Sequence, residues 1–167
     1  MTADGWFKTG DIGRIDEQGF LKITDRKKDL LKTSGGKYIA PSAIESRFKA
    51  ICPIAAQMVV HADRRNYATA LVTLDPDTLV QWAESNEVEG DYTAMAANER
   101  TRAYVGQCIE ELNASLNRWE TVKDFRVLDH DFSVETGELT PTLKVKRKAC
   151  TQKYLAQLDA MYDEKRL

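Results

Sequence analysis

The sequence lacks several features that would assign it to particular classes of protein. Among its 167 residues no apolar run approaches the roughly 18 residues that a membrane-spanning helix needs. The first residues have neither the basic region nor the apolar core of a signal peptide. The net charge of −2 provides no overall attraction to nucleic acid or to an anionic membrane surface. We therefore expect a soluble globular protein.

Cysteine and histidine are scarce. The three cysteines, Cys52, Cys108 and Cys150, are odd in number, widely spaced and without a Cys-x-x-Cys pair. We interpret them as reduced structural thiols, which predicts a cytoplasmic protein. With His61 and His130 as the only histidines, and no clustered ligands, no metal site is expected in this chain.

The residues that are present favour one ordinary domain. Hydrophobic residues make up 43% of the chain and charged residues 30%, which is enough for a real core. Patterning predicts strands at 6–16, 20–23, 54–60, 67–74 and 122–128, and helices at 41–52, from 76, at 93–117 and at 146–163. Because these elements do not alternate regularly, the predicted fold class is α+β.

Local signals mark the helix starts. Ser42 and Glu45 have the spacing of a capping box, and Asp75 followed by proline is typical of an N-cap. In the last helix, Leu155 is expected to face inward with its apolar neighbours.

A charged run, Asp-Arg-Lys-Lys-Asp at 25–29, precedes a double glycine. Burying five consecutive charges would be costly, so we expect residues 25–29 to form an exposed joint. Gly35 and Gly36 predict a tight turn between two short strands, with a positive φ at one glycine or both. The hairpin before the joint is too small to be stable alone, which predicts a larger partner surface.

Two further segments could carry chemistry. In Trp-Phe-Lys-Thr-Gly-Asp at 6–11, the carboxylate of Asp11 could accept hydrogen bonds from the vicinal hydroxyls of a ribose, although Thr-Gly-Asp alone is more typical of a plain turn. In Thr-Pro-Thr-Leu-Lys-Val-Lys-Arg-Lys at 140–148, basic residues at a helix start oppose the helix dipole and favour a nearby anion. The alternative for this segment is a basic patch that serves solubility.

Taken together and in this order, the three segments resemble the last three signature motifs of the ANL superfamily of adenylate-forming enzymes. Residues 6–11 resemble its ribose-binding motif, residues 25–45 its hinge motif and glycine loop, and residues 141–147 its C-terminal lysine motif. The resemblance covers nearly the whole chain. The residues of the hinge and lysine motifs are most similar to those of long-chain fatty acyl-CoA synthetases.

The resemblance implies roles for individual residues near the joint. Asp11 would bind the ribose hydroxyls of ATP or of the acyl-adenylate, and Arg26 would lie beside the same ribose. Lys28 would be the hinge position about which the C-terminal domain swings. Gly35 and Gly36 would line the pantetheine tunnel, where bare backbone lets a thin ligand pass.

Lys144 would be the mobile catalytic lysine that bridges the fatty-acid carboxylate and the α-phosphate. One departure is that Thr142 and Leu143 stand where most of the superfamily has Ser-Gly before this lysine. Lys146 and Lys148 therefore remain competitors for the role.

The resemblance also implies that part of the enzyme lies outside this sequence. The Ser/Thr/Gly-rich phosphate loop, the acyl pocket and the magnesium-binding glutamate motif are absent. Residues 1–25 would end a large N-terminal domain, 26–29 would form the hinge, and 30–167 would form a mobile domain with a small mixed or antiparallel sheet flanked by helices.

ATP or AMP and CoA would act in the full-length enzyme, and Mg²⁺ would bind in the N-terminal domain that is absent here. The chain alone is expected to bind none of these and to be inactive. Its partner would be its own N-terminal domain, and any peripheral contact with a membrane would come through that part.

Two alternatives stay open. A related adenylating domain could transfer its acyl group to a carrier protein, because carrier phosphopantetheine and CoA present the same arm to the glycine loop. A nucleic-acid-binding domain could use the lysines at 144–148, but the acidic net charge and the absence of neighbouring aromatic residues argue against it.

Overall fold

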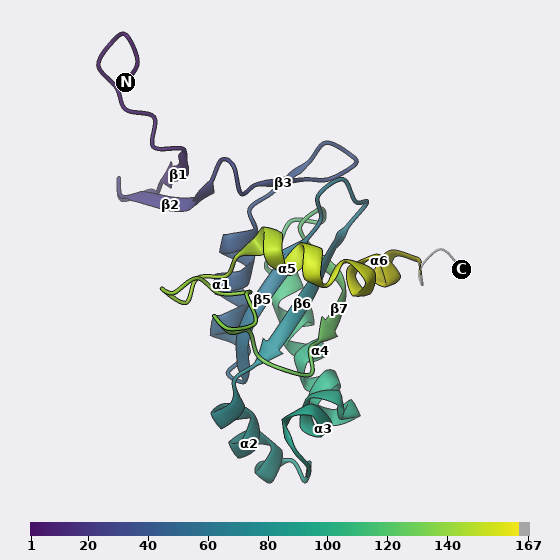
Figure 1. Cartoon of the computed structure of the whole chain (residues 1–167). Coiled ribbons are helices and arrows are strands. Elements are labelled where there is room, and N and C mark those ends of the chain that lie inside the picture. The colour runs from purple at the N-terminus through teal and green to yellow at the C-terminus, as the bar shows by residue number, and fades with distance from the viewer. Residues whose placement is uncertain (164–167) are drawn as a thin grey trace.

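The computed structural model describes residues 1–163 (Figure 1). A small N-terminal hairpin stands apart from a lobe built on a three-stranded sheet, and a short connection joins the two. The last four residues of the predicted mobile domain, 164–167, lie outside the described residues. Within residues 1–163, no helix combines the length and apolar character needed to cross a bilayer.

The N-terminal hairpin pairs β1 (Asp11–Ile15) with β2 (Leu21–Arg26) in antiparallel register. The predicted first strand over 6–16 is too long at its start, because Gly10 turns the chain with φ +80°. Several large apolar side chains of this segment are more than half exposed: Trp6, Phe7, Ile15, Phe20, Leu21 and Ile23. The hairpin therefore offers an apolar surface that residues 1–163 leave uncovered.

The sheet of the lobe has the order β5–β6–β7. Strand β5 (Ala55–His61) is antiparallel to the central strand β6 (Ala68–Leu74), and β7 (Val122–Val127) is parallel to β6. A parallel pair needs a crossover connection, which here contains α2 (Pro76–Ser85), α3 (Tyr92–Ala97) and α4 (Glu99–Ala114). The predicted α+β class and the small mixed sheet are confirmed.

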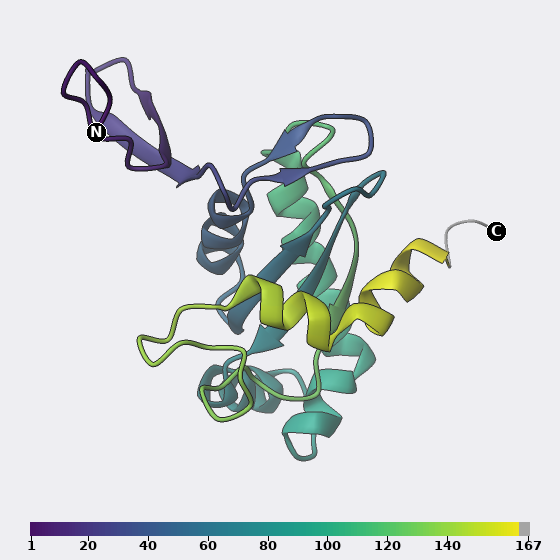
Figure 2. The ribbon, with the colours of Figure 1, turned by 45° about the horizontal axis from the view of Figure 1, so that its top comes forward.

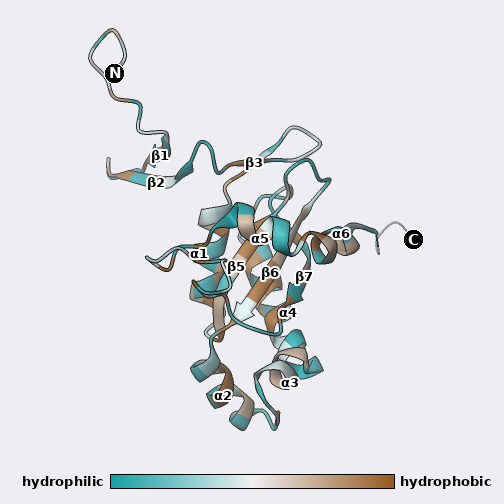
Figure 3. Ribbon diagram, in the orientation of Figure 1, coloured by the Kyte–Doolittle hydropathy of each residue, from teal (hydrophilic) through white to brown (hydrophobic). Residues whose placement is uncertain are grey.

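Helices cover both faces of the sheet (Figures 1 and 2). Helices α1 (Pro41–Ile51) and α4 lie on one face, while α5 (Arg147–Lys153) and α6 (Leu155–Asp163) cross the other. Successive residues of β5 alternate accordingly: Met58 and Val60 belong to the core under α1, and Val59 belongs to the core under α5 and α6. Figure 3 shows the resulting hydrophobic centre on β5 and β6.

Two predicted helices are each divided in the structure. The region 93–117 breaks at Asn98, whose extended backbone leaves the helix and whose side chain accepts a hydrogen bond from the Arg100 N–H at 2.9 Å. The region 146–163 breaks at Tyr154, where φ is −105° and ψ is 20°. Leu155, which was predicted to face inward, is instead 45% exposed, because it is the first residue of α6 and no preceding turn of that helix covers it.

The start of α1 differs from the predicted capping box. Ala40 occupies the N-cap position and makes no side-chain cap. Ser42 instead donates its hydroxyl to Asp25 at 3.2 Å, and Glu45 pairs with Arg147. The capping box was wrong because both side chains have partners from distant parts of the chain.

Candidate functional site

The open end of the N-terminal hairpin brings Asp11 and Arg26 together. The register of β1 and β2 places the two residues opposite each other, and Arg26 Nε lies 3.3 Å from Asp11 Oδ1. They line a groove of about 1000 Å³ that also includes residues of β2, α1 and the segment after α4. The two predicted ribose-binding residues are therefore adjacent, as a shared ligand would require.

The joint after β2 is exposed only in part. Residues 27–29 form a turn in which Asp29 N–H donates to the Arg26 carbonyl at 3.0 Å, and Lys28 is exposed. Asp25, however, is 5% exposed, so the expectation that all of 25–29 lies exposed was wrong. Its carboxylate accepts hydrogen bonds from the Ser42 N–H at 3.1 Å and the Ser42 hydroxyl, which offset the cost of burial. Asp25 thus supplies a capping carboxylate to the N-terminus of α1 from across the joint.

The double glycine lies in an exposed turn between β3 (Leu31–Lys32) and β4 (Tyr38–Ile39), as predicted. Gly36 has φ +79°, which favours glycine for conformational reasons. Gly35 has no such requirement: a Cβ placed there would have its nearest neighbour, Thr33 Oγ1, at 4.0 Å. The packing within residues 1–163 therefore does not explain the glycine at position 35.

Lys144 lies near the tip of a tight hairpin that projects from the lobe before α5, seen in yellow-green at the left of Figure 2. The turn closes through hydrogen bonds from Leu143 N–H to the Thr140 carbonyl and from Thr140 N–H to the Lys144 carbonyl, both 2.8 Å. Leu143 has φ +58°, a left-handed conformation at the position where the superfamily pattern has glycine. The Lys144 side chain is exposed, so its amine is free to reach beyond the lobe.

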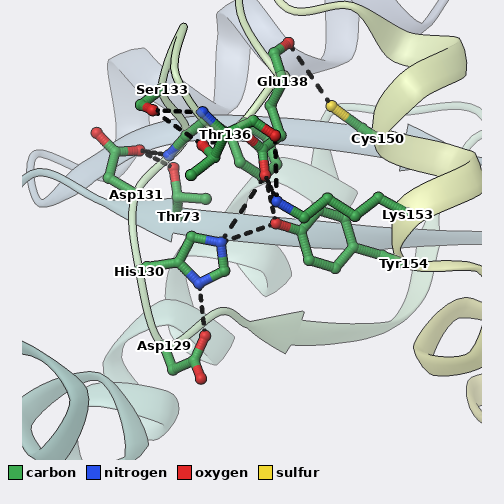
Figure 4. Close-up of polar contacts among 11 residues, drawn as sticks. Thr73, Asp129, His130, Asp131, Ser133, Thr136, Glu138, Cys150, Lys153 and Tyr154 are labelled. Carbon is green, nitrogen blue, oxygen red and sulfur yellow. Dashed lines mark hydrogen bonds and ion pairs between the residues drawn. The ribbon is translucent and has the colours of Figure 1, made fainter.

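A polar cluster braces the base of this hairpin (Figure 4). The side chain of Glu138 is 1% exposed and accepts hydrogen bonds from Lys153 Nζ at 2.5 Å, the Tyr154 hydroxyl at 2.7 Å and Thr136 Oγ1. Desolvation alone would raise the pKa of Glu138, but the hydrogen bonds from Lys153, Thr136 and Tyr154 outweigh it and lower the pKa to about 2. His130 extends the cluster, with Nε2 at 2.8 Å from the Tyr154 hydroxyl.

This lowered pKa predicts a pH-dependent contribution to stability. The ordinary pKa of the group is 4.5, so the ionised carboxylate stabilises the fold above that pH, and the contribution is lost as the pH falls through about 2. By linkage it amounts to roughly 3 kcal/mol. We expect the difference in free energy of unfolding between the native chain and Glu138→Gln to shrink over this acidic range, as measured by urea denaturation. Glu110→Gln, which removes an exposed carboxyl, is the control, and a constant difference would contradict the assignment.

Arg147, within the lysine motif, is held by a paired carboxylate. Its two terminal nitrogens lie 2.6 and 2.7 Å from the two oxygens of Glu45, which also accepts the Val60 N–H at 2.8 Å. Burial raises the pKa of Glu45, and Arg147 offsets part of that rise. Desolvation alone would lower the pKa of Arg147, but Glu45 and the charges of Asp25 and Asp29 raise it. The hinge motif and the lysine motif therefore meet around one partly buried pair.

The structure brings some of the predicted residues together and leaves others apart. Asp11 and Arg26 share the groove, whereas Lys144, Gly35 and Gly36 are not among its lining residues. Sequence reasoning missed Glu138 and the Glu45–Arg147 pair, because partners 15 to 102 positions apart leave no local pattern. Among residues 1–163, no group of three or more His, Cys, Asp or Glu side chains is arranged to hold a metal ion.

Comparisons with known proteins place these features in a family. Residues 28–166 match the model of the AMP-binding enzyme C-terminal domain. The chain is 38% identical over 164 residues to long-chain-fatty-acid–CoA ligase FadD15 of Mycobacterium tuberculosis, covering 97% of this chain and 27% of the relative. It is 34% identical over 165 residues to human long-chain-fatty-acid–CoA ligase 6, covering 97% of this chain and 24% of that relative. The chain thus spans about a quarter of the length of these relatives.

Solved structures agree with this placement. The adenylation domain of a carboxylic acid reductase from Segniliparus rugosus, in complex with AMP and a co-purified carboxylic acid, matches with a TM-score of 0.73 and 25% identity, covering 97% of this chain and 24% of that one. A fatty acyl CoA synthetase of Mycobacterium tuberculosis matches with a TM-score of 0.53 and 28% identity, covering 92% of this chain and 25% of that one. On sequence and fold together, the chain belongs to the AMP-binding enzyme C-terminal domain family.

Proposed function

We propose that this chain is the C-terminal part of a cytoplasmic long-chain fatty acid–CoA ligase. In this proposal residues 1–25 complete a large N-terminal domain, 26–29 form the hinge and 30–167 form the mobile domain. The enzyme activates a fatty acid with ATP to acyl-AMP and then transfers the acyl group to CoA. The relatives named as long-chain-fatty-acid–CoA ligases, at 34–38% identity, support this function.

The observation that carries the proposal is the exposed Lys144 on a hairpin with a braced base. An exposed ammonium on a rigid support can enter another domain's active site and hold two anionic groups for in-line attack. Asp11 and Arg26 hold the ribose, Lys28 is the pivot, and Mg²⁺ belongs to the N-terminal domain. The exposed apolar side chains of the β1–β2 hairpin support contact with that domain.

The function is tested by assaying the longer protein that contains this chain. With ATP, CoA and palmitate we expect fatty-acid-dependent pyrophosphate release and acyl-CoA formation. The 167-residue chain alone is expected to form no acyl-CoA, because residues 1–163 show only one part of the required site. Acyl-CoA formation by the purified 167-residue chain would contradict the proposal that the active site needs the N-terminal domain as well.

Gly35 gives a prediction specific to the second half-reaction. Because a Cβ at Gly35 has open space around it, Gly35→Leu should leave the free energy of unfolding of the chain within about 0.5 kcal/mol of the native value. If position 35 lines the path of the pantetheine arm, the same variant should raise the KM for CoA about 10-fold or more while acyl-AMP formation is retained. Half-reaction kinetics and urea denaturation measure the two effects.

Gly106→Ala is the control for Gly35→Leu, because Gly106 lies on α4, outside the proposed tunnel, and a Cβ there would make ordinary contacts with the Phe125 ring at 3.7 and 3.9 Å. It should leave the KM for CoA within about twofold of the native value. An unchanged KM for CoA in Gly35→Leu would argue against the tunnel assignment.

A second acceptor is favoured by one observation. The solved structures with TM-scores of 0.72 and 0.73 are adenylation domains of carboxylic acid reductases, and a further match is described as an adenylation–PCP didomain of such an enzyme. Transfer of the acyl group to a carrier protein is therefore the second candidate function. Product analysis with CoA and with a phosphopantetheinylated carrier distinguishes the two acceptors.

A further inference from the structure

The hairpin that carries Lys144 is fixed to the lobe at its base. Residues 141–144 are all exposed, and Leu143 at the tip is 67% exposed, so burial does not hold this end. The base is closed by an isolated antiparallel bridge between Leu139 and Val145 and by a hydrogen bond from Lys146 N–H to the Glu138 carbonyl at 2.7 Å. The direction in which Lys144 points is therefore determined where residue 138 meets the lobe.

Glu138 is held there by donors from outside the hairpin. Lys153 Nζ at 2.5 Å and the Tyr154 hydroxyl at 2.7 Å come from the end of α5, and Thr136 Oγ1 comes from the preceding loop. His130 Nε2 contacts the Tyr154 hydroxyl at 2.8 Å, and its Nδ1 lies 2.6 Å from Asp129 Oδ1. Figure 4 shows these side chains converging on Glu138, whose carboxylate is almost fully buried.

We propose that Glu138, held by Lys153 and Tyr154, is a positioning residue that aims Lys144 for the adenylation half-reaction. This inference rests on the role proposed above for Lys144. A flexible lysine contributes fully only when its backbone is fixed, since a misplacement of about 1 Å in an active site can cost about 100-fold in rate. Because the Glu138 side chain is 1% exposed and its carboxylate is bonded within the lobe, we expect it to act through the hairpin rather than by contact with the reacting groups.

The test uses Glu138→Gln and Tyr154→Phe in the longer enzyme. We expect the kcat of acyl-AMP formation to fall about 10-fold or more in each, with the KM for ATP and fatty acid changed less than about twofold. Thioester formation from preformed acyl-AMP should be unaffected. Hydrogen exchange of the backbone amides of residues 139–146 should become faster in both variants, which reports the loosened hairpin without an activity measurement.

Tyr162→Phe is the matched control. It also removes a buried tyrosine hydroxyl of the same lobe, one that accepts a hydrogen bond from Thr69 Oγ1 and donates to the carbonyls of His61 and Tyr67, so its hydrogen-bond partners within residues 1–163 lie outside the hairpin. It should not alter exchange at 139–146 or the ratio of the two half-reactions. If Glu138→Gln does not fold, Tyr154→Phe provides the same test.

A double variant separates this inference from the proposed function. In a Lys144→Ala background, Glu138→Gln should reduce acyl-AMP formation no further, because the group being aimed is already absent. If the losses of acyl-AMP formation in Lys144→Ala and Glu138→Gln multiply in the double variant, the positioning role is overturned and the proposed function stays intact. The same holds if Glu138→Gln and Tyr154→Phe alone change neither the half-reactions nor the hydrogen exchange, as expected for Tyr162→Phe. Full acyl-AMP formation by Lys144→Ala itself would overturn the proposed function and the positioning role together.

Discussion

Replacing Lys144 by alanine in the longer enzyme is expected to lower acyl-AMP formation about 100- to 1000-fold, the usual cost of losing one preorganised charge-stabilising group. An ammonium about 4 Å from an oxyanion contributes on the order of 4 kcal/mol at an effective dielectric constant of 20. Thioester formation from preformed acyl-AMP should fall much less, because the lysine has no anion to bridge in that step. Isotope exchange between ATP and pyrophosphate and single-turnover transfer to CoA measure the two half-reactions.

The segment that follows Lys144, at the start of α5, supplies the controls for this prediction. Lys146 and Lys148 are also exposed and basic, so alanine at either position removes an equal charge without touching Lys144. Both variants should keep acyl-AMP formation within about threefold of the native rate, since screening leaves exposed charges with weak effects. Equal loss of both half-reactions in Lys144→Ala, or an equal effect of Lys146→Ala, would contradict the assignment.

Breaking the Glu45–Arg147 pair should have the largest effect on stability. Arg147→Ala leaves the Glu45 carboxylate without its bidentate partner, and the side chains are only 16% and 21% exposed. Removing one member of such a pair costs about 3–5 kcal/mol, and the partial exposure of this pair places the expected loss near the lower value. Urea denaturation of the chain measures the change.

Two variants calibrate this result. Glu45→Gln combined with Arg147→Met removes both charges and should recover more than half of the loss, because the penalty comes mainly from the unpaired charge. Arg100→Ala breaks an ion pair in which the side chains are 60% and 88% exposed, and should cost less than about 1 kcal/mol. A loss in Arg147→Ala no larger than in Arg100→Ala would show that the Glu45–Arg147 pair is unimportant for stability.

Local sequence signals correctly predicted the helix starts and turns that neighbouring residues determine. The start of α2 follows from the Asp75 cap, and the β3–β4 turn follows from Gly36, because neighbouring residues determine both. The resemblance of three ordered motifs supplied all six candidate site residues, and the structure places two of them, Asp11 and Arg26, in contact.

The errors at the start of α1 and in the joint arose where a distant partner overrode a local pattern. Ser42 and Glu45 have the spacing of a capping box. In the structure, however, the Ser42 hydroxyl donates to Asp25, and the Glu45 carboxylate pairs with Arg147. Asp25 is buried within a run of charges because the N-terminus of α1 lies against it, and no periodicity in the run indicates this. Tertiary contacts of this kind, including those of Glu138, are determined by the fold rather than by the local sequence.

The hydrogen bonds between Asp25 and Ser42 have a consequence for motion. They join the last strand before the proposed pivot to the first helix after it, so a rotation at 26–29 that separates these elements must break them. A hydrogen bond to a charged group contributes about 1.5–3 kcal/mol. These bonds would therefore favour the orientation of the lobe seen here over a rotated one. In the proposed cycle of two orientations, the Ser42 hydroxyl would contribute one of these bonds and the Ser42 backbone N–H the other.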